Sequence, residues 1–381
     1  MYITMWNIQT NHLCSAVRVI QPEQNNMEKL KVMKLPSLKI RHLESEYPVI
    51  QAGMGVKIGS AELAAAVVEC GGYGTIASVG LGDVERGKYH FVEECNNKFS
   101  DEIHRAQDRL KGKKPLGVNV MVALSNYKEI VETAVKEGVD FIISGAGLPL
   151  NLPEFVGDAN IALIPVVSSA RAFDLVLRTW ERKYNRKPDA VIVEGPRNGG
   201  HLGFTMEQIE HPETCSLDIL YKEIKEVADQ AGLTGLPIIA AAEVACRADV
   251  ERMISYGYNG VQVGTYFIAT EEAGIDEKSK MVWINATEKD VVIIKSPVGL
   301  PVRVLRTPLV ERVLTGEKQR FTCPYRCLRS CNPAKSLFCI ARALIATYQG
   351  DVENGLYMTG CNVGASTRIF PVKEFFDTLK D

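Results

Sequence analysis

The chain has 381 residues, 46% of them hydrophobic, and a formal net charge of -2 from 44 basic and 46 acidic side chains. This length is ample for a large core, in one barrel-sized domain or in two domains. The balanced charge argues against nucleic acid or a membrane surface as partner, and no apolar stretch is long enough to span a bilayer. We therefore expect a small-molecule substrate. The sequence is also compatible with a homodimer. The ten cysteines, mostly scattered, are typical of reduced thiols in the cytoplasm rather than of a disulfide framework.

A repeating unit runs from Tyr47 to Phe267: a short apolar strand, a turn rich in glycine or serine, then a helical segment. Strands are expected at 48–52, 73–78, 116–121, 141–144, 162–167, 190–193, 237–241 and 260–267, and helices at 61–70, 85–110, 129–136, 171–182 and 249–255. Eight such units predict a TIM (β/α)8 barrel, whose site lies at the carboxyl ends of the strands. An open doubly wound sheet is the alternative, but no G-x-G-x-x-G turn follows the first strand.

After Ala269 the repeat stops. We expect a charged, partly helical stretch at 270–289, a strand at 291–294, a rigid turn at 296–301, and helices at 336–348 and 372–379. This region is too long to be a linker and is expected to pack over the barrel mouth. The predicted organisation is an N-terminal extension (1–34), a barrel (35–275) and a mostly helical C-terminal cap with a cysteine cluster (276–381).

The sixth strand leads into a loop that delivers one histidine. The buried run Ala190–Val193 is followed by Glu194 and by the glycine-rich segment 195–203, which carries His201. Glycines let the backbone approach a ligand closely, and histidine exchanges a proton near neutral pH. The alternative is a surface-loop histidine without a chemical role.

Other polar or glycine-rich features also follow strands. They are Gly53-Met54-Gly55, Asn119, Gly145-Ala146-Gly147, Ala242-Glu243 and Gly264-Thr265. Each glycine alone is consistent with a tight turn, but their shared place at one face of a barrel favours a cofactor site. Loops after the seventh and eighth strands commonly bind phosphate, which would set the ring of a mononucleotide over the barrel axis.

These residues carry a resemblance to a known family. The segment Pro48–Gly55 resembles the first flavin-contacting segment of the nitronate monooxygenase family, formerly called 2-nitropropane dioxygenases, which includes FMN-dependent enoyl-acyl-carrier-protein reductases. Further segments resemble its successive strand ends, in order: 117–121, 144–147, 164–167, 194–203, 237–241, and 263–267 with 270–272. The resemblance covers roughly Leu35 to Val310.

The resemblance implies an FMN-binding barrel. On it, Gly53, Met54 and Gly55 line the isoalloxazine, Asn119 hydrogen-bonds to it, and Gly145 lies near the ring and ribityl chain. His201 matches the catalytic histidine, and Gly264 and Thr265 hold the phosphate. The remaining cofactor-binding positions are Glu194, Gly200, Ala242 and Glu243.

The activity implied first is oxidation of alkyl nitronates or nitroalkanes with dioxygen. The alternative is a reductase that takes electrons from NAD(P)H and acts on an enoyl thioester or a quinone. A third hypothesis is a barrel that has lost its flavin and serves as a binding module.

One pair of residues departs from the family pattern. Where paired glycines are usual after the seventh strand, this chain has Ala242 and Glu243. A carboxylate beside a phosphate costs energy unless it points to solvent or pairs with a cation, and Arg247 is the candidate cation.

The cysteines Cys323, Cys327, Cys331 and Cys339 form the spacing C-x3-C-x3-C-x7-C. This spacing matches neither ferredoxin runs nor paired C-x2-C zinc sites, so no metal site is predicted and an iron–sulfur cluster is the weaker alternative. If Pro324 begins a helix, Cys327 and Cys331 share one face, which is also consistent with plain packing.

Overall fold

The computed structural model describes residues 34–82, 90–323 and 326–380. Three expectations therefore lie wholly or partly outside the described residues: the N-terminal extension up to residue 33, the start of the helix expected from 85, and a helix start at Pro324. None of the helices in the described part of the chain is both long and apolar enough to cross a membrane.

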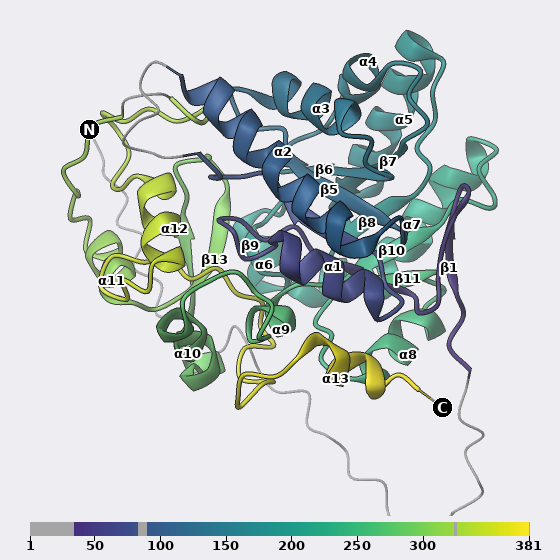
Figure 1. The fold of residues 1–381 in the computed structure, drawn as a ribbon. Coiled ribbons are helices and arrows are strands. Elements are labelled where there is room, and N and C mark those ends of the chain that lie inside the picture. Colours follow the sequence, from purple (N-terminus) through teal and green to yellow (C-terminus); the bar gives the residue numbers. More distant parts are fainter. Residues whose placement is uncertain (1–33, 83–89, 324–325, 381) are drawn as a thin grey trace, which may run out of the picture.

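Eight parallel strands form the centre of the molecule (Figure 1). In sheet order, β3 is followed by β11, β10, β8, β7, β6, β5 and β4. A parallel bridge between Ile50 and Tyr73 joins the two ends of this order, with Gln51 N donating to Tyr73 O at 2.9 Å. The ring of strands is thereby closed, and the predicted TIM barrel is confirmed. Its strands are β3 (Val49–Gln51), β4 (Gly74–Ala77), β5 (Leu116–Met121), β6 (Phe141–Gly145), β7 (Ala162–Val167), β8 (Val191–Glu194), β10 (Ile238–Ala241) and β11 (Gly260–Val263).

The barrel interior is filled by branched and aromatic side chains. Ile50, Ile143 and Ile192 belong to one buried cluster in which the rings of Tyr73 and Phe141 meet edge to face at 5.5 Å. The hairpin of β1 (Leu38–Ile40) and β2 (Leu43–Ser45) packs on the same cluster, and Tyr73 donates its hydroxyl to the carbonyl of Leu43 at 3.1 Å. Because Tyr73 and Phe141 lie where strands begin, the hairpin closes the amino-terminal end and leaves the opposite end for a site.

Helices surround the strands. Ser60 and Ser169 cap α1 and α5 by accepting the N–H of the residue three positions on, which explains why these helices begin directly after their turns. The helices of the barrel are α1 (Ala61–Glu69), α2 (Phe91–Leu110), α3 (Tyr127–Lys136), α4 (Leu152–Val156), α5 (Ala170–Tyr184), α6 (Met206–Glu210), α7 (Leu217–Gln230), α8 (Arg247–Ser255) and α9 (Thr265–Ile268).

The last strand is shorter than expected. A strand was predicted over 260–267, but β11 ends at Val263 and the short helix α9 begins at Thr265. Gly264, with φ -117° and ψ -86°, lies between them as the N-cap residue. Phe267 and Ile268 are buried on this helix, where a short apolar run also fits, so the sequence pattern could not separate a strand from a helix here.

The C-terminal region, expected to be mostly helical with one strand, has a second strand as well. It contains α10 (Glu277–Asn285), β12 (Val291–Lys295), β13 (Pro301–Leu305), α11 (Pro308–Leu314), α12 (Ile340–Tyr348) and α13 (Val372–Asp377). Strands β12 and β13 form an antiparallel hairpin, and β13 also pairs with the two-residue strand β9 (Gly200–His201). The C-terminal region is therefore joined by backbone hydrogen bonds to the loop that carries the predicted catalytic histidine.

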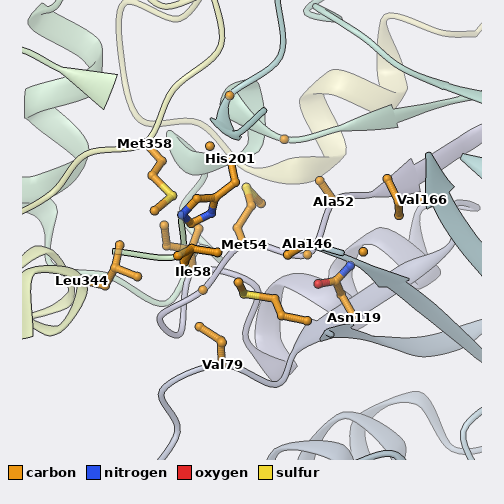
Figure 2. A pocket seen from close by; sticks show the side chains of 18 of the residues that line it. Ala52, Met54, Ile58, Val79, Asn119, Ala146, Val166, His201, Leu344 and Met358 are labelled. Atoms are coloured by element: carbon orange, nitrogen blue, oxygen red, sulfur yellow. The ribbon is translucent and has the colours of Figure 1, made fainter. Parts of the chain in front are cut away.

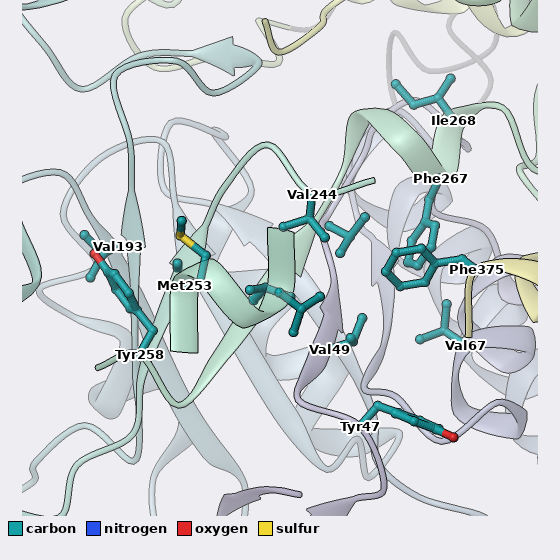
Figure 3. Close-up of a cluster of buried hydrophobic side chains, with 14 of the residues drawn as sticks. Tyr47, Val49, Val67, Val193, Val244, Met253, Tyr258, Phe267, Ile268 and Phe375 are labelled. Atoms are coloured by element: carbon teal, nitrogen blue, oxygen red, sulfur yellow. The ribbon is translucent and has the colours of Figure 1, made fainter. Parts of the chain in front are cut away.

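Helix α13 returns to the barrel wall. Phe375 meets Phe267 edge to face at 5.2 Å, beside Val67 of α1 (Figure 3). The helix expected from 336 begins at Ile340. Residues 326–339 form turns, bends and a bridge, so of the two arrangements left open for Cys327 and Cys331 the shared helix face is not the one found. Leu328 instead forms an antiparallel bridge with Leu124, after β5.

Candidate active site

A cavity of about 440 Å³ lies at the carboxyl ends of the barrel strands, between the barrel loops and the C-terminal region. All twelve site residues predicted from the sequence line it. They are Gly53, Met54, Gly55, Asn119, Gly145, Glu194, Gly200, His201, Ala242, Glu243, Gly264 and Thr265. The structure thus brings them together, while their individual roles stay predictions.

One wall of the cavity is formed where the backbone at Gly53 packs closely against the side chain of Asn119. A β-carbon placed on Gly53 would lie 2.2 Å from the β-carbon of Asn119, so only glycine fits there. A β-carbon on Gly55 would lie 2.3 Å from Val79 Cγ1. The carboxamide of Asn119 is consequently held on the cavity wall, as Figure 2 shows, with donor and acceptor atoms available to a planar ligand.

His201 faces the cavity from β9, between Met54 and Met358 (Figure 2). Its Nε2 lies 2.7 Å from Ser296 Oγ, which also accepts the N–H of Val298 at 3.1 Å. Burial lowers the pKa of His201 to about 4, because the apolar surroundings disfavour the charged imidazolium. The imidazole is therefore neutral near pH 7 and is held in place by the β12–β13 turn.

Glu194 stands at the end of β8 on the same cavity wall. Burial raises the pKa of Glu194 to about 7. Among the described residues its carboxyl group forms neither a hydrogen bond nor an ion pair. A substantial fraction of this side chain is consequently a neutral acid at neutral pH, able to donate a hydrogen bond.

Glu243, the departure from the family pattern, is paired with Arg197. Arg197 Nε donates to Oε2 at 2.6 Å and Nη2 donates to Oε1 at 3.3 Å. The expected pairing of Glu243 with Arg247 was wrong. Arg247 instead donates to Glu251 at 2.8 Å and to the carbonyl of Leu379 at 2.6 Å. Because the two-point contact with Arg197 offsets the carboxylate charge, Glu243 repels a nearby anion less than the sequence suggested.

The C-terminal region also reaches the end of β11. The N–H of Gly360 donates to Thr265 Oγ1 at 2.9 Å, and both residues line the cavity. A β-carbon on Gly199 would lie 2.5 Å from the carbonyl carbon of Thr359. Sequence reasoning missed Gly360, Arg197 and Ser296, because their contacts join segments about 45 to 95 residues apart.

The cysteine cluster borders the cavity through Cys327. Its segment is fixed to the loop after β5, with Ser125 N donating to Cys327 O at 3.0 Å. Burial, and then the negative charges of Cys339, Cys323 and Cys331, raise the pKa of Cys327 to about 12. Within residues 34–82, 90–323 and 326–380, no group of three or more histidine, cysteine, aspartate or glutamate side chains is placed to hold a metal ion. Cys327 and Cys331 pack on the apolar cluster of the C-terminal region.

The cavity fits a flavin mononucleotide in its chemistry. Glycines 53 and 55 leave room beside one wall, Asn119 and Glu194 supply hydrogen-bonding groups, and the loops after β10 and β11 both reach the cavity. A wide, mostly apolar wall with few polar groups is typical of cofactor sites.

Comparisons with known proteins agree with this arrangement. A curated relative from Mycobacterium tuberculosis, named (3aS,4S,5R,7aS)-5-hydroxy-7a-methyl-1-oxo-octahydro-1H-indene-4-carboxyl-CoA dehydrogenase, is 28% identical over 277 residues, which are 72% of this chain and 67% of that protein. A probable nitronate monooxygenase from Staphylococcus aureus is 25% identical over 296 residues, covering 71% of this chain and 78% of the relative. The solved structure of FabK from Thermotoga maritima matches with a TM-score of 0.68 and 27% identity, over 88% of this chain and 92% of that one.

The family described as nitronate monooxygenase matches residues 37–381. This range includes the barrel, the histidine loop and the whole C-terminal region. The chain therefore belongs to the nitronate monooxygenase family and is an oxidoreductase.

Proposed function

We propose that this protein is an FMN-dependent oxidoreductase that oxidises alkyl nitronates and nitroalkanes with dioxygen, with His201 next to the reacting carbon. The observation that carries the proposal is the position of the His201 imidazole, half-buried at the cavity wall and hydrogen-bonded to Ser296; the lowered pKa of His201 keeps it neutral near pH 7. A neutral imidazole can accept the α-proton of a nitroalkane. The negative charge that develops on the nitro group would then stabilise the imidazolium, offsetting the cost of burying it.

The other residues of the site would orient the cofactor and shield the reacting carbon from water. Met54, Leu344 and Met358 surround His201 with apolar surface, which limits water at the reacting carbon (Figure 2). FMN, when bound, supplies the electron acceptor for the substrate and the site of reaction with dioxygen. Asn119 and Glu194 would hold its ring, and Gly264 and Thr265 its phosphate.

The first test is the absorbance spectrum of the purified protein, which should show bound FMN; a colourless protein would instead support the binding module.

The second test is His201→Asn, with the exposed His211→Asn as matched control. His201→Asn should keep FMN and lower kcat/KM on neutral nitroalkanes by about 100-fold or more, while activity on preformed nitronates falls less, because only the neutral substrate needs a base. Equal turnover of nitroalkanes by the two variants would remove His201 from the mechanism.

A second candidate function is reduction of an enoyl thioester with electrons from NAD(P)H. This function is favoured by the charge of the cavity wall, because none of the lining residues is a lysine or an arginine. The titratable lining residues are Cys95, Glu194, His201, Glu243 and Cys327. Such a wall suits a neutral substrate better than a preformed anion. Anaerobic stopped-flow separates the two functions: rapid loss of flavin absorbance on mixing with NADH or NADPH supports the reductase, and loss only with nitronate supports the oxidase.

A further inference from the structure

Arg303 is a buried cation outside the set of residues named so far. It lies on β13, opposite Gly200 and one position from Val302, which pairs with His201. Its side chain is on the face of the strand away from Val302 and Val304, and the residue is only 2% exposed. The guanidinium donates from Nη1 to the carbonyl of Asn198.

This burial lacks a compensating charge. Among the described residues no carboxylate forms an ion pair with Arg303. The carboxylate of Glu243 is already paired with Arg197, on the loop that faces β13. Removing a guanidinium from water is unfavourable unless an anion or a full set of hydrogen-bond acceptors replaces the water. The carbonyl of Asn198 replaces only part of the lost hydration, so the guanidinium of Arg303 is suited to a negatively charged ligand nearby.

The peptide group between Asn198 and Gly199 connects Arg303 to the cavity. The bond is trans, so its C=O and N–H point in opposite directions, the C=O toward Arg303. Asn198 and Gly199 both line the cavity. A β-carbon on Gly360 would lie 3.5 Å from Gly199 N and 3.3 Å from Thr265 Oγ1, so this nitrogen lies at the end of β11 where the phosphate is expected.

We propose that Arg303 is a positioning residue for the phosphate monoester of the bound cofactor. Its hydrogen bond fixes and polarises the Asn198–Gly199 peptide, so that the N–H of Gly199 points toward the anion, and its positive charge balances the phosphate from behind the loop. The inference rests on the proposed FMN site. It also explains how a phosphate is accepted beside Glu243, since Arg197 compensates the carboxylate and Arg303 compensates the ligand.

The test compares FMN with riboflavin, which has the same ring and no phosphate. Binding of each flavin to flavin-free full-length protein is measured by quenching of flavin fluorescence, for wild type, Arg303→Gln, Arg303→Lys and the exposed control Arg306→Gln. Arg303→Gln should weaken FMN binding by about 10- to 100-fold and leave riboflavin binding unchanged. Arg303→Lys, which keeps the charge, should lose less FMN affinity, and Arg306→Gln should match wild type.

A structural role alone would weaken FMN and riboflavin binding by the same factor, and that result would overturn the inference. Unchanged FMN affinity in Arg303→Gln would overturn it as well. If Arg303→Gln does not fold, the comparison of the two flavins in Arg303→Lys decides by the same criterion. Wild-type protein that binds neither flavin would contradict the FMN proposal itself, a result distinct from a failure confined to Arg303.

Discussion

Two titratable side chains of the cavity, Glu194 and His201, have pKa values displaced in opposite directions by the same burial. The pKa of Glu194 rises from 4.5 to about 7, so its contribution to stability is present below pH 4.5 and is lost as the pH rises toward 7. The pKa of His201 falls from 6.5 to about 4, so its contribution is present above pH 6.5 and is lost as the pH falls toward 4. Between pH 4.5 and 6.5 the two contributions offset each other.

Single substitutions should expose this balance in the flavin-free protein. Glu194→Gln leaves only the His201 contribution, so its Tm should drop relative to wild type as the pH falls from 6.5 to 4. His201→Asn leaves only the Glu194 contribution, so its Tm should drop relative to wild type as the pH rises from 4.5 to 7. Since one pKa unit corresponds to about 1.4 kcal/mol, each effect is on the order of 3 kcal/mol.

The measurement is thermal unfolding across pH 4–8, with the exposed Glu207→Gln as control. Other titrating groups are common to all the proteins and cancel in the comparison. Profiles of Glu194→Gln and His201→Asn that run parallel to wild type would show that neither pKa is displaced by folding.

At single positions, the sequence predicted which residues meet but not how their side chains pair. Residues at strand ends converge because a parallel barrel places all carboxyl ends at one rim, so strand assignment alone located the site. Whether Glu243 pairs with Arg247 or Arg197 depends on loop conformation. Arg247 was the closer in sequence, but the carbonyl of Leu379 on the returning C-terminus holds it.

Among elements, the contact between the histidine loop and the C-terminal segment offers a direct test. A β-carbon on Gly199 would lie 2.5 Å from the carbonyl carbon of Thr359 and 2.6 Å from the nitrogen of Gly360, both backbone atoms that cannot rotate away. Gly199→Ala should therefore force the segments apart, weaken FMN binding, and cost about 1–3 kcal/mol of stability, seen as a lower Tm.

Gly235→Ala is the matched control, because nothing lies within 4 Å of a β-carbon there. It should leave both the Tm and FMN affinity close to wild type. If Gly199→Ala behaves as Gly235→Ala does, the close approach of the two segments is not maintained in solution.

Apolar runs in the sequence predicted the barrel strands, whose hydrogen bonds join neighbouring units of the chain. The strands β5 and β7 match the expected ranges at both ends. The two-residue strand β9 could not be predicted, because its partner β13 lies about a hundred residues later and β9 is too short to show a strand pattern. The segment around Cys327, for which the sequence left a helix and plain packing open, pairs with the loop after β5 through contacts that no local pattern indicates.

On the scale of the whole molecule, the barrel and the C-terminal region share the cavity. In Figure 2, Asn119, Val166 and Ala52 lie on one side of His201 and Leu344 and Met358 on the other. The barrel side carries the predicted flavin contacts. The C-terminal region supplies eight apolar side chains to the lining of the cavity: Val298, Leu300, Leu328, Ile340, Leu344, Ile345, Leu356 and Met358.

This division predicts selection by chain length, whichever reaction the protein catalyses. An alkyl or acyl chain that starts beside His201 would extend along the apolar wall, and each added methylene buried there should raise kcat/KM about three- to fourfold until the space is filled. Leu344→Trp narrows that space without touching the flavin side, so it should end the rise at a shorter chain and leave the FMN content unchanged. Leu175→Trp, at a residue 47% exposed on α5, is the matched control and should keep the wild-type series. A kcat/KM independent of chain length in the wild type would mean that the substrate does not enter the space under α12, and the C-terminal region would then serve only to hold Ser296 and Gly360 in place.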